Sequence, residues 1–401
     1  MRNNQSGFLA NLVIRESHVL PLLLSLLVIY FAQGFLYEGG SSLSQSALFL
    51  ILGISGFYFV LTVFLREKKD MFFNAWTALL LLNIIGFFLS GDISNSSHFG
   101  MLKGVMVSLL TFYPFYYFTR KNMLQEKHLV YFLIVMLPIA IIQFVLKREQ
   151  ILLDRSGNNE NVVSNVAYVF ANLIPFVFFI RKRVLSFVIS FILVFFTIQG
   201  AKRGAIITAG IGLIIYIYYQ LQAVKEKNYV LNYVLTFIAV SILIYYTYKV
   251  FQSNEYLITR LEKMAEGNVS NRDAIYTNIM SGWFNSDNIL NLIFGFGFAG
   301  SLKLSGTGNF AHNDWLELLS NFGLIGVFIY LWVFYAAYRL IRNPYWTKEK
   351  KIIMITVVIM WFLTTLFSMG YTSMNGYLRA MILAYLIGSE NNNFGKDSDN
   401  I

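Results

Sequence analysis

His312 stands in the sequence setting best suited to chemistry, because Ala311-His312-Asn313-Asp314 directly precedes a predicted helix. Asn313 or Asp314 can cap that helix, and Glu317 is placed to complete a box-like cap from Asp314. Free backbone N–H groups at a helix N-terminus favour an anion, and a neutral imidazole can accept a proton from a hydroxyl group. The plainer interpretation is a polar residue at a membrane interface. Because no second histidine stands at the spacing of H-E-x-x-H, we expect no metal site.

Two arginines have the chemistry to bind phosphate. Arg203 follows Lys202 in a tight turn between two apolar runs, and Arg272 follows Ser270-Asn271. The Ser-Asn pair predicts an N-cap, which places Arg272 in the first turn of a helix. A guanidinium grips phosphate through two parallel hydrogen bonds. Snorkelling of the two turn cations into lipid headgroups is the alternative. Further cations predicted on the same side are Lys147, Arg148, Arg155 and Arg379.

The run Gly295 to Gly300 literally fits G-x-G-x-x-G, a pattern found in nucleotide-binding loops. That pattern indicates nucleotide binding only between a strand and a helix of a βαβ unit, and no such unit is predicted here. We interpret the run as a glycine-rich turn that returns the chain to the membrane.

The elements that must position these residues are membrane-spanning helices. Hydrophobic residues make up 57% of the chain and charged residues only 13%, too few to cover a soluble surface. The absence of cysteine excludes disulfide and thiolate chemistry. The apolar runs predict an all-α polytopic bundle of about twelve transmembrane helices. These runs are 18–37, 43–65, 71–90, 101–118, 129–146, 164–180, 184–199, 204–220, 229–249, 323–340, 352–369 and 376–388.

The basic residues set the predicted orientation. The formal net charge is +10, but the cations lie mostly in short clusters between apolar runs, which argues against a nucleic-acid-binding face. With residues 1–17 in the cytoplasm, inward segments hold 19 of the 31 lysines and arginines, and short outward segments hold 7. The positive-inside rule then predicts cytoplasmic termini and an extracytoplasmic site.

One long outward segment, 250–313, divides the chain. Residues 1–249 carry nine predicted transmembrane helices, residues 314–388 carry three, and residues 389–401 form a polar cytoplasmic tail. Within the long segment, the sequence predicts amphipathic helices over 254–266 and from Arg272 through Phe284. A loop of this length at a membrane surface is usually functional.

An ordered set of motifs runs along residues 197–340: KRGA between two spans, NRDAIY and LIFGFGFAG in the long loop, and AHNDWLELLSNFGLIG opening a span. This set resembles the O-antigen ligase/polymerase family, which comprises Wzy-type polysaccharide polymerases and WaaL-type O-antigen ligases. The resemblance implies that Arg203, Arg272 and His312 are the catalytic residues. Further candidate substrate-binding residues are Lys202, where the family usually has serine, and Arg155, Asn313 and Arg379.

The resemblance implies glycosyl transfer from an undecaprenyl-diphosphate-linked oligosaccharide on the outer face of a bacterial cytoplasmic membrane. Two arginines and a helix N-terminus would stabilise the leaving diphosphate, and the histidine would deprotonate or orient the acceptor hydroxyl. Neither a metal nor another cofactor is expected. The expected partners are the lipid-linked donor, a sugar acceptor on a lipid carrier and membrane lipids, with a chain-length regulator and a flippase as further ones, and no nucleic acid.

Three other functions stay open. An O-antigen ligase would break the same donor bond but transfer to lipid A core; we favour a polymerase because the chain matches the ligase pattern only locally. A transporter or lipid flippase would typically show two similar halves and charges within its spans, and we find no clear repeat and few such charges. A structural scaffold would leave the outward cations and the long loop unexplained.

Overall fold

The regular secondary structure is entirely helical wherever the structure describes the chain. The computed structural model describes residues 4–34, 41–64, 69–154, 164–222 and 272–389, with five isolated positions between 237 and 249. No β-strand occurs in these ranges. A helix satisfies its backbone hydrogen bonds internally, as a lipid environment requires. The prediction of an all-α fold is confirmed.

Within the described residues, eight helical segments are long and apolar enough to cross a membrane. They lie in α1 (Asn4–Gly34), α2 (Ser42–Phe64), α3 (Met71–Ser90), the continuous run of α4 (Ser96–Val105), η1 (Met106–Leu110) and α5 (Phe112–Arg120), α6 (Glu126–Asp154), α9 (Arg203–Gln222), α15 (Asp314–Ile341) and α16 (Lys348–Phe367). Three shorter apolar segments are α7 (Val166–Leu173) with η2 (Ile174–Phe179), α8 (Arg183–Gln199) and α17 (Tyr377–Gly388).

These segments, eight and three, correspond to eleven of the twelve predicted runs. The run 229–249 lies outside the described residues apart from the five isolated positions, and so does the predicted helix 254–266. The structure therefore supports a helical membrane protein with at least eight candidate spans.

Local signals set where individual helices begin. Asp70 caps α3, because its carboxylate accepts a hydrogen bond from the backbone N–H of Phe73 at 2.8 Å. Thr347 caps α16 in the same way through the N–H of Lys350. Pro175, which has no backbone N–H, stands at the start of η2, where the α-helix α7 gives way to a 3₁₀ segment.

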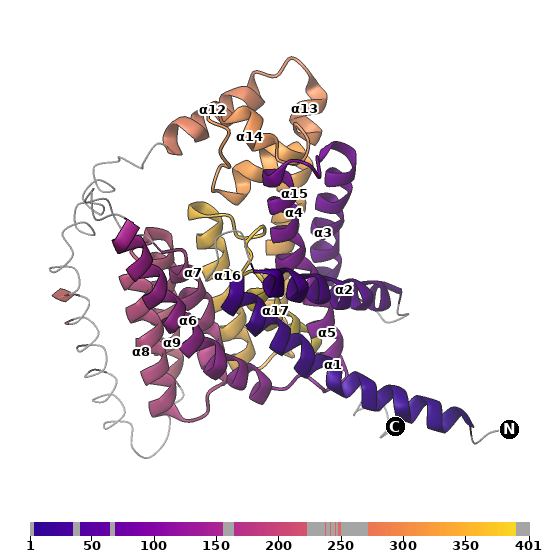
Figure 1. The fold of residues 1–401 in the computed structure, drawn as a ribbon, viewed down its shortest axis with the longest axis vertical. Helices are drawn as coiled ribbons and strands as arrows, with labels where there is room; N and C mark the ends of the chain where they lie inside the picture. The colour runs from indigo at the N-terminus through magenta and orange to yellow at the C-terminus, as the bar shows by residue number, and fades with distance from the viewer. Residues whose placement is uncertain are drawn as a thin grey trace.

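Three short helices gather at one end of the molecule, above α3 and α15 (Figure 1). They are α12 (Arg272–Phe284), α13 (Ile289–Phe294) and α14 (Gly300–Leu304), and we call residues 272–313 the cap. α12 covers the helix predicted from Arg272 through Phe284, while its predicted N-cap at Ser270-Asn271 lies outside the described residues.

Glycines let the cap approach the spans closely. Gly295 and Gly297 have φ of +77° and +90° and form the turn that leads from α13 to α14, in line with the interpretation as a turn. α15 breaks at Gly323, where φ is +58°. A Cβ added there would lie 2.6 Å from the carbonyl carbon of Ile293, so this position needs glycine.

Aromatic side chains fill the interior, and apolar side chains also cover much of the surface. Trp76 donates a hydrogen bond to the carbonyl of Leu109 at 2.9 Å and contacts the ring of Trp361. Phe88 and Phe328 are among many large apolar side chains that point outward from the spans. Such a surface suits hydrocarbon and would be unfavourable in water.

Candidate functional site

His312 lies where the cap joins α15, in the left-handed backbone conformation with φ of +52°. A residue other than glycine adopts this conformation only where the surroundings hold it there. The side-chain oxygen of Asn313 accepts hydrogen bonds from the N–H groups of Trp315 at 2.9 Å and Leu316 at 3.2 Å. Asn313 is therefore the residue that caps α15, and His312 stands one position before it.

Glu317 does not form the predicted box-like cap with Asp314. Its carboxylate accepts hydrogen bonds from the hydroxyl of Ser301 at 2.7 Å and from the N–H of Ala311 at 2.5 Å, and it is fully buried. The prediction fails because the Asp314 side chain turns into the bundle and the Glu317 side chain turns toward α14. Glu317 instead ties the chain just before His312 to α15.

Two cations lie close enough to His312 to act on its charge. Arg272, the first residue of α12, donates a hydrogen bond to the carbonyl of Phe367 at 2.9 Å and also bonds Tyr276. Desolvation lowers the pKa of His312, and the positive charges of Arg272 and Lys202 lower it further. An imidazole with a lowered pKa is neutral near pH 7 and can accept a proton.

Arg203 begins α9 at the same place. The next residue, Gly204, packs so closely that an added Cβ would lie 2.4 Å from the hydroxyl oxygen of Tyr168 and 2.6 Å from the Cβ of Phe367. Phe367 is also the residue whose carbonyl accepts the hydrogen bond from Arg272. The first residues of α9 and α12 therefore meet at the end of α16, close to His312.

A cavity of about 440 Å³ adjoins this cluster, with His312 and Arg379 in its wall. Lys147 adds a further cation, and eight residues with hydroxyl or amide groups share the rest of the wall with apolar side chains such as Phe31 and Met374. These polar residues are Tyr30, Asn165, Tyr168, Asn172, Thr364, Ser368, Ser373 and Asn375. Their donors and acceptors suit a ligand rich in hydroxyl groups, and the cations suit an anionic group.

A buried polar network under the cavity was not expected from the sequence. Asp314 is fully buried and accepts hydrogen bonds from the hydroxyl of Tyr330 at 2.6 Å and the N–H of Gly370 at 2.7 Å. Arg379 is 5% exposed, donates to the carbonyl of Gly370 at 2.7 Å and lies 4.6 Å from the ring centroid of Trp361. Gly370 is thus held from both sides. The sequence contains one signal for this network: Asp314 is an acidic residue in an apolar helix, and such a residue needs a buried partner.

The remaining predicted site residues take different places. The side chain of Asn313 is used by the helix cap and by a hydrogen bond to the carbonyl of Leu366 at 3.3 Å. Arg155 lies outside the described residues. Within the described ranges, no group of three histidine, cysteine, aspartate or glutamate residues could hold a metal ion.

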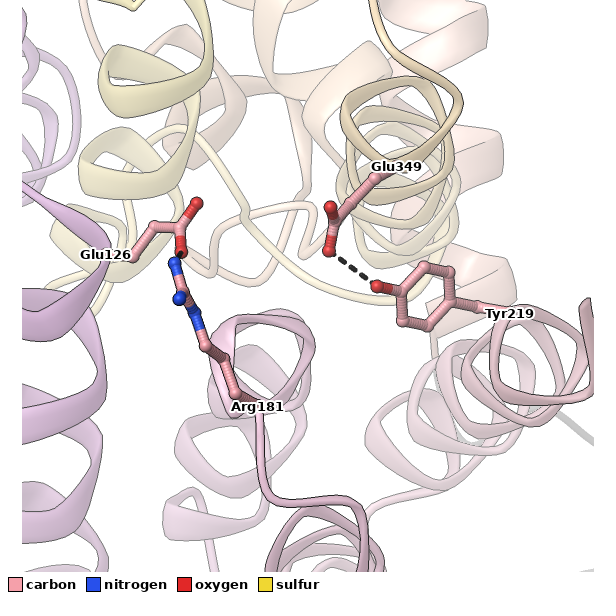
Figure 2. A network of polar contacts seen from close by, with 4 residues as sticks. All are labelled: Glu126, Arg181, Tyr219 and Glu349. Atoms are coloured by element: carbon pink, nitrogen blue, oxygen red, sulfur yellow. Dashed lines mark hydrogen bonds and ion pairs between the residues drawn. The ribbon is translucent and has the colours of Figure 1, made fainter. Parts of the chain in front are cut away.

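A larger cavity of about 620 Å³ lies at the far end of α9 from Arg203. Figure 2 shows two polar contacts at its wall: Arg181 lies 3.5 Å from Glu126, and the hydroxyl of Tyr219 donates to Glu349 at 2.5 Å. The Arg181 side chain is 91% exposed, so this ion pair is largely hydrated. None of the predicted site residues lines this second cavity.

Comparison of the sequence with known protein families finds no match, and no curated protein matches it. The resemblance to the O-antigen ligase/polymerase family therefore rests on the order of the motifs.

Proposed function

We propose that this protein is a glycosyltransferase of the O-antigen ligase/polymerase type in a bacterial cytoplasmic membrane. Its substrate would be an undecaprenyl-diphosphate-linked oligosaccharide, and its product a surface polysaccharide such as O-antigen, capsule or exopolysaccharide. The observation that supports this proposal is the meeting of His312 with Arg272, Lys202 and the start of α9 at Arg203, beside a cavity whose wall carries cations, hydroxyl groups and amides.

The proposed reaction breaks the bond between the anomeric carbon and the diphosphate, and forms a bond from that carbon to an acceptor hydroxyl oxygen. The hydroxyl proton passes to the neutral imidazole of His312, whose lowered pKa suits a base. The diphosphate leaves with the bond's electron pair. Arg203 and Arg272 stabilise the charge that develops on it, because a positioned donor is worth most where charge appears in the transition state.

The proposed acceptor is a second lipid-linked repeat unit, which makes the protein a polymerase. The cavity beside His312 provides hydroxyl and amide groups for the sugars. The proposed orientation places both termini in the cytoplasm and the cap outside it, since inward segments hold 19 lysines and arginines against 7 in short outward segments. Polyprenyl tails would then stay among the spans while the sugars reach the cap.

Reconstitution with a defined lipid-linked oligosaccharide tests the proposal. Purified protein in liposomes should convert the donor into a ladder of longer oligosaccharides on a gel. Transfer only to added lipid A core would identify a ligase. Binding or passage of the donor without any new glycosidic bond would favour a transporter and contradict the proposal.

A further inference from the structure

Large apolar side chains are exposed on one edge of the cap. Phe284 at the end of α12 is 72% exposed, and on α13 Ile289 is 67%, Leu290 56% and Phe294 57% exposed. None of these four residues belongs to a candidate membrane span. A patch of this kind would be unfavourable in water, so its depth relative to the membrane decides what covers it.

The length of α3 gives a first measure of that depth. α3 has 20 residues, which at a rise of about 1.5 Å per residue spans about 30 Å, the thickness of the hydrocarbon core. Its last residue, Ser90, accepts a hydrogen bond from the N–H of Phe298 at 2.7 Å. The turn that follows α13 therefore lies level with the end of a membrane-crossing helix.

α15 gives a second, independent measure. A span of about 20 residues that ends at Arg339, in the last turn of α15, begins near Ser320. The carbonyl of Ser320 accepts a hydrogen bond from the N–H of Phe296 at 2.8 Å, and the backbone of Ile293 packs on Gly323. Both measures place the end of α13 at the edge of the hydrocarbon core.

The exposed edge of the cap continues the apolar surface of α3. Phe88 and Leu89, near the end of α3, are 83% and 82% exposed, and the rings of Phe87 and Phe298 are in contact. In Figure 1, α13 stands directly above the end of α3. The lipid-facing end of α3 is thus joined to the cap at Phe298, through the Phe87 ring contact and the hydrogen bond to Ser90.

We infer that α13 and the end of α12 lie in the interface of the membrane leaflet on the cap side, with Phe284, Leu290 and Phe294 among the lipids. Segments that present apolar side chains on one side and polar groups on the other bind this region of a bilayer, and Asn285, Asp287 and Asn288 supply polar groups between Phe284 and α13. Lipid contact anchors the cap at the membrane surface. This inference concerns where the cap lies and does not depend on the proposed reaction.

Fluorescence quenching in liposomes tests the inference, since the chain has no cysteine of its own. An environment-sensitive dye attached to Leu290→Cys should be quenched several-fold more by lipids with a nitroxide on the upper acyl chain than the same dye on Thr307→Cys. Thr307 is an exposed polar position of the same cap and serves as the control. Iodide in the water should quench the two positions in the opposite order.

Phe294→Cys provides a second probe position in case the first variant folds poorly. Iodide quenching at Leu290 and Phe294 equal to that at Thr307 would show that the patch faces water, and would overturn the inference. Protection from both quenchers, with cross-links between copies at Leu290→Cys, would show that a second copy covers the patch, which also contradicts lipid contact. Because no substrate is involved, failure here leaves the proposed reaction untouched.

Discussion

Arg203 and Arg272 differ from lysine in a way that kinetics can detect. Lysine keeps the positive charge but offers a point donor, whereas arginine binds two phosphate oxygens in parallel. We expect Arg203→Lys and Arg272→Lys each to lower kcat about a hundredfold, equivalent to about 3 kcal/mol, with a smaller change in KM. Initial rates on the lipid-linked donor measure the effect.

Arg342→Lys is the matched control, because Arg342 lies at the opposite end of α15 from His312. This variant should keep the wild-type rate. If Arg203→Lys and Arg272→Lys also stay within about twofold of the wild type, the diphosphate does not bind at these arginines, and Arg379 in the cavity wall becomes the next candidate.

The pH dependence of the rate follows from the charges around His312. Its lowered pKa keeps the imidazole neutral to a lower pH than an ordinary histidine, so the rate should fall only below the usual value of 6.5. Lys202→Gln removes one of the cations that disfavour the imidazolium. The pKa of His312 then rises, and the acidic limb of the pH–rate profile should move to higher pH.

Lys303→Gln removes the same charge from α14 and should leave that profile in place. His312→Gln should abolish the acidic limb together with most of the rate. A His312→Gln variant with near-normal activity would mean that the imidazole only hydrogen-bonds the substrate. An unmoved limb in Lys202→Gln would show that His312 does not set the pH dependence.

Among the helices, the break in α15 is the most sensitive point. Gly323 has a positive φ and no room for a Cβ beside Ile293, so Gly323→Ala combines backbone strain with a steric clash. We expect a loss of about 2 kcal/mol or more in the free energy of unfolding. Gly210, inside α9, has open space around it, and Gly210→Ala should stabilise by up to about 1 kcal/mol.

Thermal unfolding in detergent, followed by the protein's own fluorescence, compares the two variants. Equal stability of Gly323→Ala and the wild type would show that α13 does not press against α15 as the structure has it. A loss in Gly210→Ala as large as in Gly323→Ala would show that the effect is not specific to the break.

Most of the helical plan could be predicted from the sequence, because a span appears as an apolar run of membrane-crossing length and some spans also carry a local capping residue. Met71–Ser90 agrees with the predicted run 71–90, since Asp70 and Gly91 mark its ends locally. The break at Gly323 could not be predicted, because glycine is needed there only once the backbone of Ile293 arrives from a distant segment.

The candidate site was predictable in part for the same reason. Capping signals near Asn313 placed His312 before a helix, which depends on neighbours in the chain. The meeting of Lys202 with His312, and the hydrogen bonds of Asp314 and Arg379 to Gly370, depend on tertiary packing. Nothing in the local sequence around these residues specifies that packing.

At the scale of the whole molecule, the proposed orientation places the cap outside the cytoplasm and the start of α6 inside it. Chemical labelling can establish on which side of the membrane each lies. Single cysteines at Thr307 in the cap and at Lys127 at the start of α6 occupy exposed positions. In intact cells with a permeable outer envelope, an impermeant maleimide should label Thr307→Cys and should label Lys127→Cys only after the inner membrane is opened. Labelling of Lys127→Cys alone would invert the proposed orientation.

In the proposed reaction, protein cations support the transfer of sugar from a diphosphate carrier at the cap without a metal ion. The most direct measurement is a single-turnover reaction in liposomes with a fluorescent lipid-linked oligosaccharide and excess EDTA. Undecaprenyl diphosphate and the new glycosidic bond should appear together, in equal amounts and at the rate seen without EDTA. Absence of both products with folded protein, or their appearance only after magnesium or manganese is added, would contradict this reaction.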